Sequence, residues 1–123
     1  MPRETELLIA VGHYFDGLYN CDVTLLDQVF LPASSLFDVD EGAIVVDPYP
    51  AWREVVAHRP SPASVGQERQ EEVVSVTWLS EKAASVHVRL RVLSSVFVDH
   101  LSFVDGPDGW KIVAKVWHLE STV

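Results

Sequence analysis

The second half of the chain contains four segments in which apolar and polar residues alternate, and this pattern constrains the fold more than any other feature. The segments run over about 69–79, 83–93, 96–104 and 110–118. Period-two alternation predicts strands with one buried face. The connections 80–82, 94–95 and 105–109 contain Ser, Asp, Gly and Pro, which are typical of turns. The sequence therefore predicts an antiparallel meander.

The first half of the chain has the spacing of helices. Apolar residues recur at helical intervals from about 5 to 19, and Asp22 is placed to cap a second short helix that ends at Pro32. Short strands are predicted at 35–39 and 43–46, and Pro50 begins a third helix. Three helices before a meander predict an α+β domain in which the helices cover one sheet face. Such packing can leave a pocket open at one end.

Asp99 stands out within the predicted strand 96–104. Alternate residues of a strand share a face, so Asp99 should point the same way as Phe97, Leu101 and Phe103. An unpaired carboxylate is costly to bury, so Asp99 should be protonated, hydrogen-bonded, or open to a cavity. Each of these makes Asp99 a candidate for a functional site.

Length, composition and charge narrow the class of protein. A chain of 123 residues with 48% apolar and 22% charged residues predicts a single soluble domain spanning 1–123. The net charge of −9 disfavours nucleic acid as a partner. The lone Cys21 and the dispersed histidines predict no disulfide, metal site or cofactor. No apolar run is long enough to span a membrane, so we expect a cytoplasmic protein.

Two motifs carry a family resemblance. The segment 14–19 reads Tyr-Phe-Asp-Gly-Leu-Tyr, and 109–116 reads Gly-Trp-Lys-Ile-Val-Ala-Lys-Val. With the order of elements, they resemble the NTF2-like (cystatin-like) superfamily, and most closely the group named "putative lumazine-binding". The resemblance implies a cone with a cavity between the first helix and a curved antiparallel sheet. It also implies a homodimer through the outer sheet face, where Val96, Val98 and Val113 are expected.

A second resemblance, to ketosteroid isomerase within the same superfamily, is mechanistic. It places Tyr14 and Asp99 at the two positions that hold the substrate oxygen, and Asp38 at the position of the proton-transferring base. Tyr14 and a protonated Asp99 would then donate to an oxygen that gains negative charge. The alternative is that Tyr14 and Asp99 satisfy one another in a closed core. Asp38 has its own alternative, a solvated acidic hairpin with Asp40 and Glu41.

The remaining candidates concern the pocket walls. Lys115 is expected to point outward, and Trp110 is expected to pack beneath the helices. Most aromatic side chains are as well explained by core packing. The candidates for binding a small apolar or heterocyclic ligand are Phe15, Trp52, Trp78, Phe97, Leu101, Phe103 and His118.

The function predicted from these residues is a cofactor-independent acid/base enzyme of the isomerase, dehydratase or cyclase type. Its substrate would be a small apolar carbonyl compound, as the likeness to ketosteroid isomerase and SnoaL-like enzymes implies. The alternatives are a ligand-binding module that performs no reaction and a dimerising scaffold with a filled cone.

Overall fold

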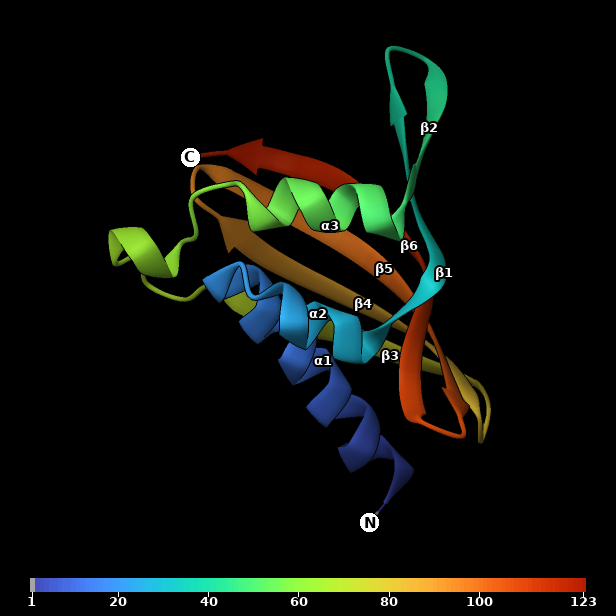
Figure 1. The fold of residues 1–123 in the computed structure, drawn as a ribbon. Helices are drawn as coiled ribbons and strands as arrows, with labels where there is room; N and C mark the ends of the chain where they lie inside the picture. Colours follow the sequence, from blue (N-terminus) through green and yellow to red (C-terminus); the bar gives the residue numbers. More distant parts are fainter. Residues whose placement is uncertain (1) are drawn as a thin grey trace.

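A computed structural model describes residues 2–123 of the chain (Figure 1). The helices are α1 (Arg3–Asn20), α2 (Val23–Val29), α3 (Tyr49–Ala57) and the short 3-10 turn η1 (Ala63–Val65). The strands are β1 (Phe30–Asp40), β2 (Ala43–Pro48), β3 (Glu71–Ser80), β4 (Ala83–Val92), β5 (Ser95–Gly106) and β6 (Gly109–Thr122). This order confirms the predicted helical hairpin, β-hairpin, third helix and four final strands.

Helices α1 and α2 form a tight hairpin. Cys21 adopts a left-handed conformation that ends α1, and the Asp22 side chain accepts hydrogen bonds from two backbone amides at the start of α2. A Cβ atom at Gly17 would lie 2.6 Å from the Leu26 side chain, so only glycine allows the two helices to approach this closely. The buried stripe of α1 includes Leu7, Val11 and Tyr14, as its spacing predicted.

Helix α2 ends earlier than predicted. The backbone at Phe30 is already extended, so the chain passes directly from α2 into β1, and Pro32 lies within the strand. Ser34 stabilises this irregular start, because its hydroxyl accepts from the amide of Leu31 and donates to the carbonyl of Ile112. The predicted strand 35–39 is therefore the second half of a longer strand.

The strands form one sheet in the order β2-β1-β6-β5-β4-β3. Strands β3 to β6 are the predicted antiparallel meander, but β1 pairs with β6 in parallel. The curved antiparallel sheet implied by the resemblance is therefore a mixed sheet, antiparallel at every pairing except β1 with β6. Apolar alternation specifies which face of a strand is buried and carries no information about its direction relative to a neighbour.

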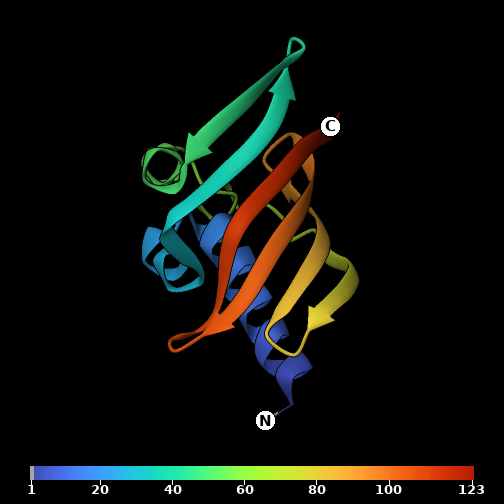
Figure 2. The same ribbon diagram turned by 90° about the vertical axis from the view of Figure 1, so that its right-hand side faces the viewer.

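The helices lie on one face of this sheet, and the other face is uncovered (Figure 2). The β1–β2 hairpin extends past the helical layer, and its tip carries exposed apolar side chains at Val39 and Ile44 (Figure 1). The core lies between the helices and the inner sheet face, where Leu36, Val86 and Leu101 are fully buried. No helix in the described part of the chain is long and apolar enough to cross a membrane.

A bulge in β6 changes which residues of this strand face inward. Ser102 pairs with Ala114 and Phe103 pairs with Ile112, so Val113 is an extra residue. A bulge shifts the alternation by one position. Trp110 and Ile112 are buried before the bulge, and Lys115 is buried after it. The expectation that Lys115 points outward was therefore wrong.

Candidate functional site

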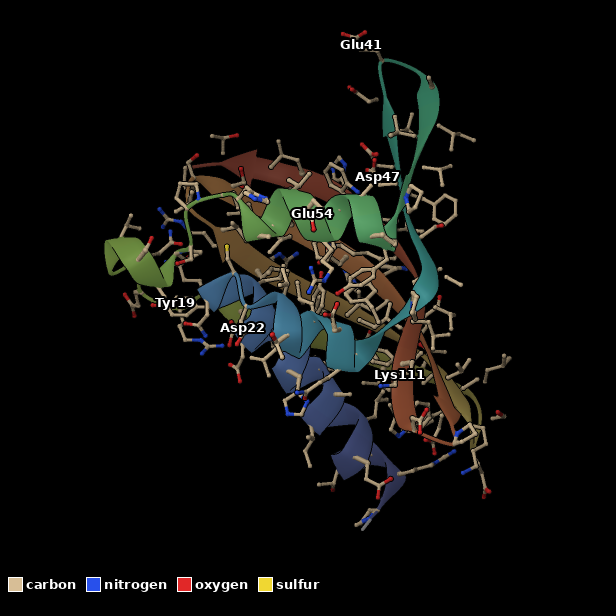
Figure 3. All side chains as sticks on the ribbon, in the orientation of Figure 1. Tyr19, Asp22, Glu41, Asp47, Glu54 and Lys111 are labelled. Carbon is tan, nitrogen blue, oxygen red and sulfur yellow. The ribbon has the colours of Figure 1, made fainter. Side chains whose placement is uncertain are left out.

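A cavity of about 330 Å³ lies between α3 and the inner faces of β4, β5 and β6. Four apolar strand residues and a tryptophan from α3 form much of its wall, and four charged side chains also line it. One of these charged residues is Asp47, which lies at the end of β2 close to the start of α3 (Figure 3). The lining residues are Leu18, Asp47, Ala51, Trp52, Val55, Arg59, Leu90, Val92, Phe97, Asp99, Lys115 and Trp117.

Asp99 and Tyr14 meet at the base of this cavity. The Tyr14 hydroxyl donates to Asp99 Oδ2 at 2.6 Å, and both side chains are almost completely buried. Burial, together with the adjacent Asp99 charge, raises the pKa of Tyr14 well above its usual value of 10.0. The phenol therefore keeps its proton and directs it at Asp99 rather than into the cavity.

Lys115 is the second partner of Asp99. Its Nζ atom lies 3.8 Å from Asp99 Oδ2, which is an ion pair at a distance too long for a good hydrogen bond. Burial is the main cause that lowers the pKa of Lys115 from its usual 10.5, and Arg59 adds to this while Asp99 opposes it. The Nζ atom also lies 4.5 Å from the centre of a Trp52 ring. Lys115 is thus a partly desolvated amine held between a carboxylate and an aromatic face.

Two buried polar atoms among the lining residues lack a hydrogen-bond partner within residues 2–123. One is Asp99 Oδ1, an acceptor, and the other is Arg59 Nε, a donor. A third such atom, Trp110 Nε1, belongs to a residue outside this lining. Buried polar atoms normally have partners, because leaving one unpaired costs about 1–3 kcal/mol. Both atoms belong to residues that line the cavity, so an acceptor and a donor without partners lie in the wall of this space.

The structure brings some of the predicted site residues together. Asp99, Trp52 and Phe97 line the cavity, and Tyr14 lies directly behind Asp99. Phe97 also contacts Trp117 edge to face, with ring centres 5.7 Å apart. These residues come from α1, α3, β5 and β6.

Five other candidates lie away from the cavity. Phe15, Leu101 and Phe103 are buried in the core and are absent from the lining. Trp78 packs against Trp110, and the Arg3 guanidinium lies over the Trp78 ring. His118 is exposed on β6, next to the inward-facing Trp117.

Asp38 lies on β1, beyond the cavity lining. It pairs with Val45, and Leu36 pairs with Asp47, so Asp38 shares a strand face with Leu36 but lies further toward the hairpin tip. Desolvation, together with the charges of Asp40 and Asp47, raises the pKa of Asp38 from its usual 3.8. The carboxylate that lines the cavity from this hairpin is Asp47.

Three charged lining residues were missed from the sequence. Lys115 was assigned to the wrong face because the bulge at Val113 is not visible in the alternation. Arg59 lies in the Pro- and Ser-rich segment after α3, where no periodicity indicates direction. Asp47 follows an apolar run and gives no signal that separates it from its acidic neighbours. Residues 2–123 contain no cluster of three His, Cys, Asp or Glu side chains suited to a metal ion.

Solved structures show the same fold at low sequence identity. An NTF2-like protein of unknown function from Silicibacter pomeroyi is 21% identical, with a TM-score of 0.82 over 94% of both chains. An NTF2-like protein of unknown function from Shewanella baltica is 20% identical, with a TM-score of 0.83 over 97% of this chain and 94% of that one. A cystatin-like fold protein from Burkholderia xenovorans is 19% identical, with a TM-score of 0.72 over 97% and 92%. These likenesses establish an NTF2-like, cystatin-like fold.

The match to a family model is more specific than the likeness of fold. No curated protein matches the chain. A family model described as "Putative lumazine-binding" matches residues 3–118, which include every residue that lines the cavity. The chain therefore belongs to this family, and its fold is NTF2-like, as the motifs at 14–19 and 109–116 suggested.

Proposed function

We propose that the cavity binds a flat heteroaromatic molecule that presents a ring N–H group beside a carbonyl oxygen. The observation that carries this proposal is the pair of unpartnered buried atoms in the lining. Asp99 Oδ1 would accept from the ring N–H, and Arg59 Nε would donate to the carbonyl oxygen. Lumazine, a bicyclic dione, has this arrangement of groups, and the family's description supports it as the first ligand to test.

The walls of the cavity support the same ligand class. Trp52, Phe97 and Trp117 supply aromatic surface, and Leu90 and Val92 supply aliphatic surface. A volume of about 330 Å³ lies at the small end of the range of ligand pockets, about 300–1,000 Å³. A compact bicyclic ring is therefore a better match than an extended or branched molecule.

The test compares lumazine binding by the wild type and by two arginine variants. Arg59→Met removes the cavity donor, and Arg89→Met is the matched control because Arg89 lies on the uncovered sheet face. We expect Arg59→Met to weaken binding about tenfold or more, since a hydrogen bond from a charged donor contributes about 1.5–3 kcal/mol. Arg89→Met should bind as the wild type does. Equal affinity of all three proteins in a calorimetric titration, or no binding at all, would exclude the proposal.

An acid/base enzyme is the second candidate function. The observation that favours it is the direct contact of Tyr14 with Asp99 beneath an apolar cavity. An oxyanion-binding site needs both groups to donate into the cavity, whereas the Tyr14 proton is directed at Asp99. We therefore place isomerase, dehydratase or cyclase chemistry second to ligand binding.

Asp38→Asn separates the two functions, with an enolisable ketone as the probe. An enzyme that uses Asp38 as its base should lose about 10²- to 10⁴-fold in turnover, with little change in affinity for the neutral ketone. A binding protein should show no turnover in either form. Turnover that is unchanged in Asp38→Asn would remove Asp38 from the mechanism and make Asp47, which lines the cavity, the next carboxylate to test.

We keep the homodimer as a proposal. The uncovered sheet face carries half-buried Val96 and Val98 and exposed Val116, which together could be covered by a second copy. Light scattering after size exclusion should give twice the chain mass. A charged substitution, Val98→Asp, should then return the protein to a monomer.

A further inference from the structure

We propose that Lys115 forms an imine with small apolar aldehydes or ketones that enter the cavity, which adds a covalent reactivity to ligand binding. The side chain of Lys115 is only 7% exposed and lines the cavity. The inference needs the same cavity as the proposed function, but it depends on a different group and a different ligand class.

The surroundings of Lys115 favour a nucleophilic amine. Its Nζ atom lies over the Trp52 ring, Leu90 and Val92 line the same cavity, and burial lowers the pKa of the amine. A lysine acts as a nucleophile only in its neutral form, so desolvation increases the reactive fraction at neutral pH. The other lysines lack this environment. Lys82 is 74% exposed and paired with Asp105, and Lys111 donates to the backbone carbonyl of Gln28.

Charged and titratable groups from several elements face Lys115. Arg59, after α3, lowers the pKa of Lys115, and Asp99 on β5 raises it. Tyr14 on α1 lies under Lys115, with the Nζ atom 5.3 Å from the phenol ring centre. Asp47 lines the same cavity. Since burial is the largest of these influences, the net direction is downward.

Asp99 is placed to carry the protons of the reaction. The Lys115 Nζ atom and Asp99 Oδ2, 3.8 Å apart in the structure, first approach to hydrogen-bond distance, and the ammonium then transfers a proton to the carboxylate. The neutral amine then attacks the carbonyl carbon, and one proton moves from nitrogen to oxygen to give a carbinolamine. Protonated Asp99 returns its proton to this hydroxyl, the C–O bond breaks, and water leaves. The products are a protonated imine on Lys115, one water molecule, and the Asp99 carboxylate that balances the imine charge.

The experiment traps this imine on the wild-type protein. 4-Methoxybenzaldehyde is added at neutral pH with cyanoborohydride, which reduces an imine to a stable amine, and peptide mass spectrometry locates the adduct. We expect Lys115 to be labelled faster than Lys82, on the order of tenfold for each unit by which its pKa is lowered. Its labelling rate should also level off below the usual lysine pKa of 10.5. In Lys115→Arg the fast adduct should disappear, and in the control Lys82→Arg it should remain.

Each outcome bears on a single claim. Labelling that follows exposure, with Lys82 ahead of Lys115 in the wild type, would overturn the inference without depending on the folding of any variant. If lumazine binds but Lys115 is not labelled preferentially, the imine fails and the proposed function stands. If Lys115 is labelled preferentially but lumazine does not bind, the imine stands and the heterocycle proposal fails.

Discussion

The two faces of the sheet each carry an ion-pair cluster, and the two clusters differ in how well their groups are satisfied. On the uncovered face, Arg89 lies 2.8 Å from both Glu72 and Glu120, and all three side chains are 39–58% exposed. On the inner face, Asp99 and Lys115 are 3.8 Å apart and only 1% and 7% exposed. The cluster with the shorter N–O distances is the one that water can reach.

This difference teaches that close ion pairing is a poor guide to functional sites. Each Arg89 ion pair is short and exposed, and water can take the place of either partner. The cluster therefore leaves no buried polar atom without a hydrogen bond. The inner pair leaves Asp99 Oδ1 without a partner next to a cavity. An incompletely satisfied buried cluster is costly to keep, and a ligand that supplies the missing partner recovers part of that cost.

The largest expected effect comes from Asp99→Ala. This change removes the acceptor of Tyr14 and the counter-charge of Lys115 at once. Removing one partner of a buried ion pair typically destabilises a protein by about 3–5 kcal/mol, and urea denaturation at pH 7 measures the loss. Asp99→Asn is the control, because its amide oxygen still accepts from Tyr14, and it should lose less. A loss no larger than that of an exposed ion pair would contradict the contrast between the faces.

Tyr14→Phe should have a smaller effect that depends on pH. The pKa of Tyr14 is raised in the folded protein, so its contribution to stability is present below about pH 10 and is lost as pH rises beyond that value. At pH 7 the variant should be less stable by about 1–3 kcal/mol, because Asp99 Oδ2 loses its donor. The difference between the two proteins should shrink in denaturations between pH 9 and 11. A constant difference would show that Tyr14 is not the titrating group.

Arg89→Ala should have the smallest effect. Its ion pairs are exposed and screened, so the thermal midpoint should be unchanged within error in physiological salt. Any small loss at low salt should vanish as salt is added. If Arg89→Ala is instead as damaging as Asp99→Ala, the outer cluster is buried in solution, which would support the proposed homodimer through that face.

The sequence predicted the inner face of β5 well and that of β6 poorly, for a physical reason. In β5, strict alternation places Asp99 on the face of Leu101 and Phe103, and all three are buried. In β6, one extra residue at Val113 reverses the alternation and brings Lys115 inside. A bulge is specified by pairing with a neighbouring strand, and a single-strand pattern does not contain that information.

Other parts of the cavity depend on tertiary placement in the same way. The helical spacing of α1 predicted that Tyr14 lies on the buried stripe. In the structure Tyr14 lies on this stripe and donates a hydrogen bond to Asp99. Arg59 lines the cavity from the segment after α3, whereas Asp38 lies on β1 outside the lining. Local sequence patterns therefore predicted the helices, the strands and most of their buried faces. The charged lining of the cavity depends on how these elements pack against one another, which the patterns do not specify.

The most direct test of the account follows the carboxyl-carbon NMR signal of Asp99 during a lumazine titration, with the signal assigned by its absence in Asp99→Asn. If Asp99 Oδ1 accepts from the ligand, this signal should shift and saturate at the binding stoichiometry. The signal of Asp105, which pairs with Lys82 outside the cavity lining, should stay unchanged. Saturation of the protein with lumazine while the Asp99 signal stays in place would show that the ligand does not complete the buried cluster, and the account of the site would be wrong.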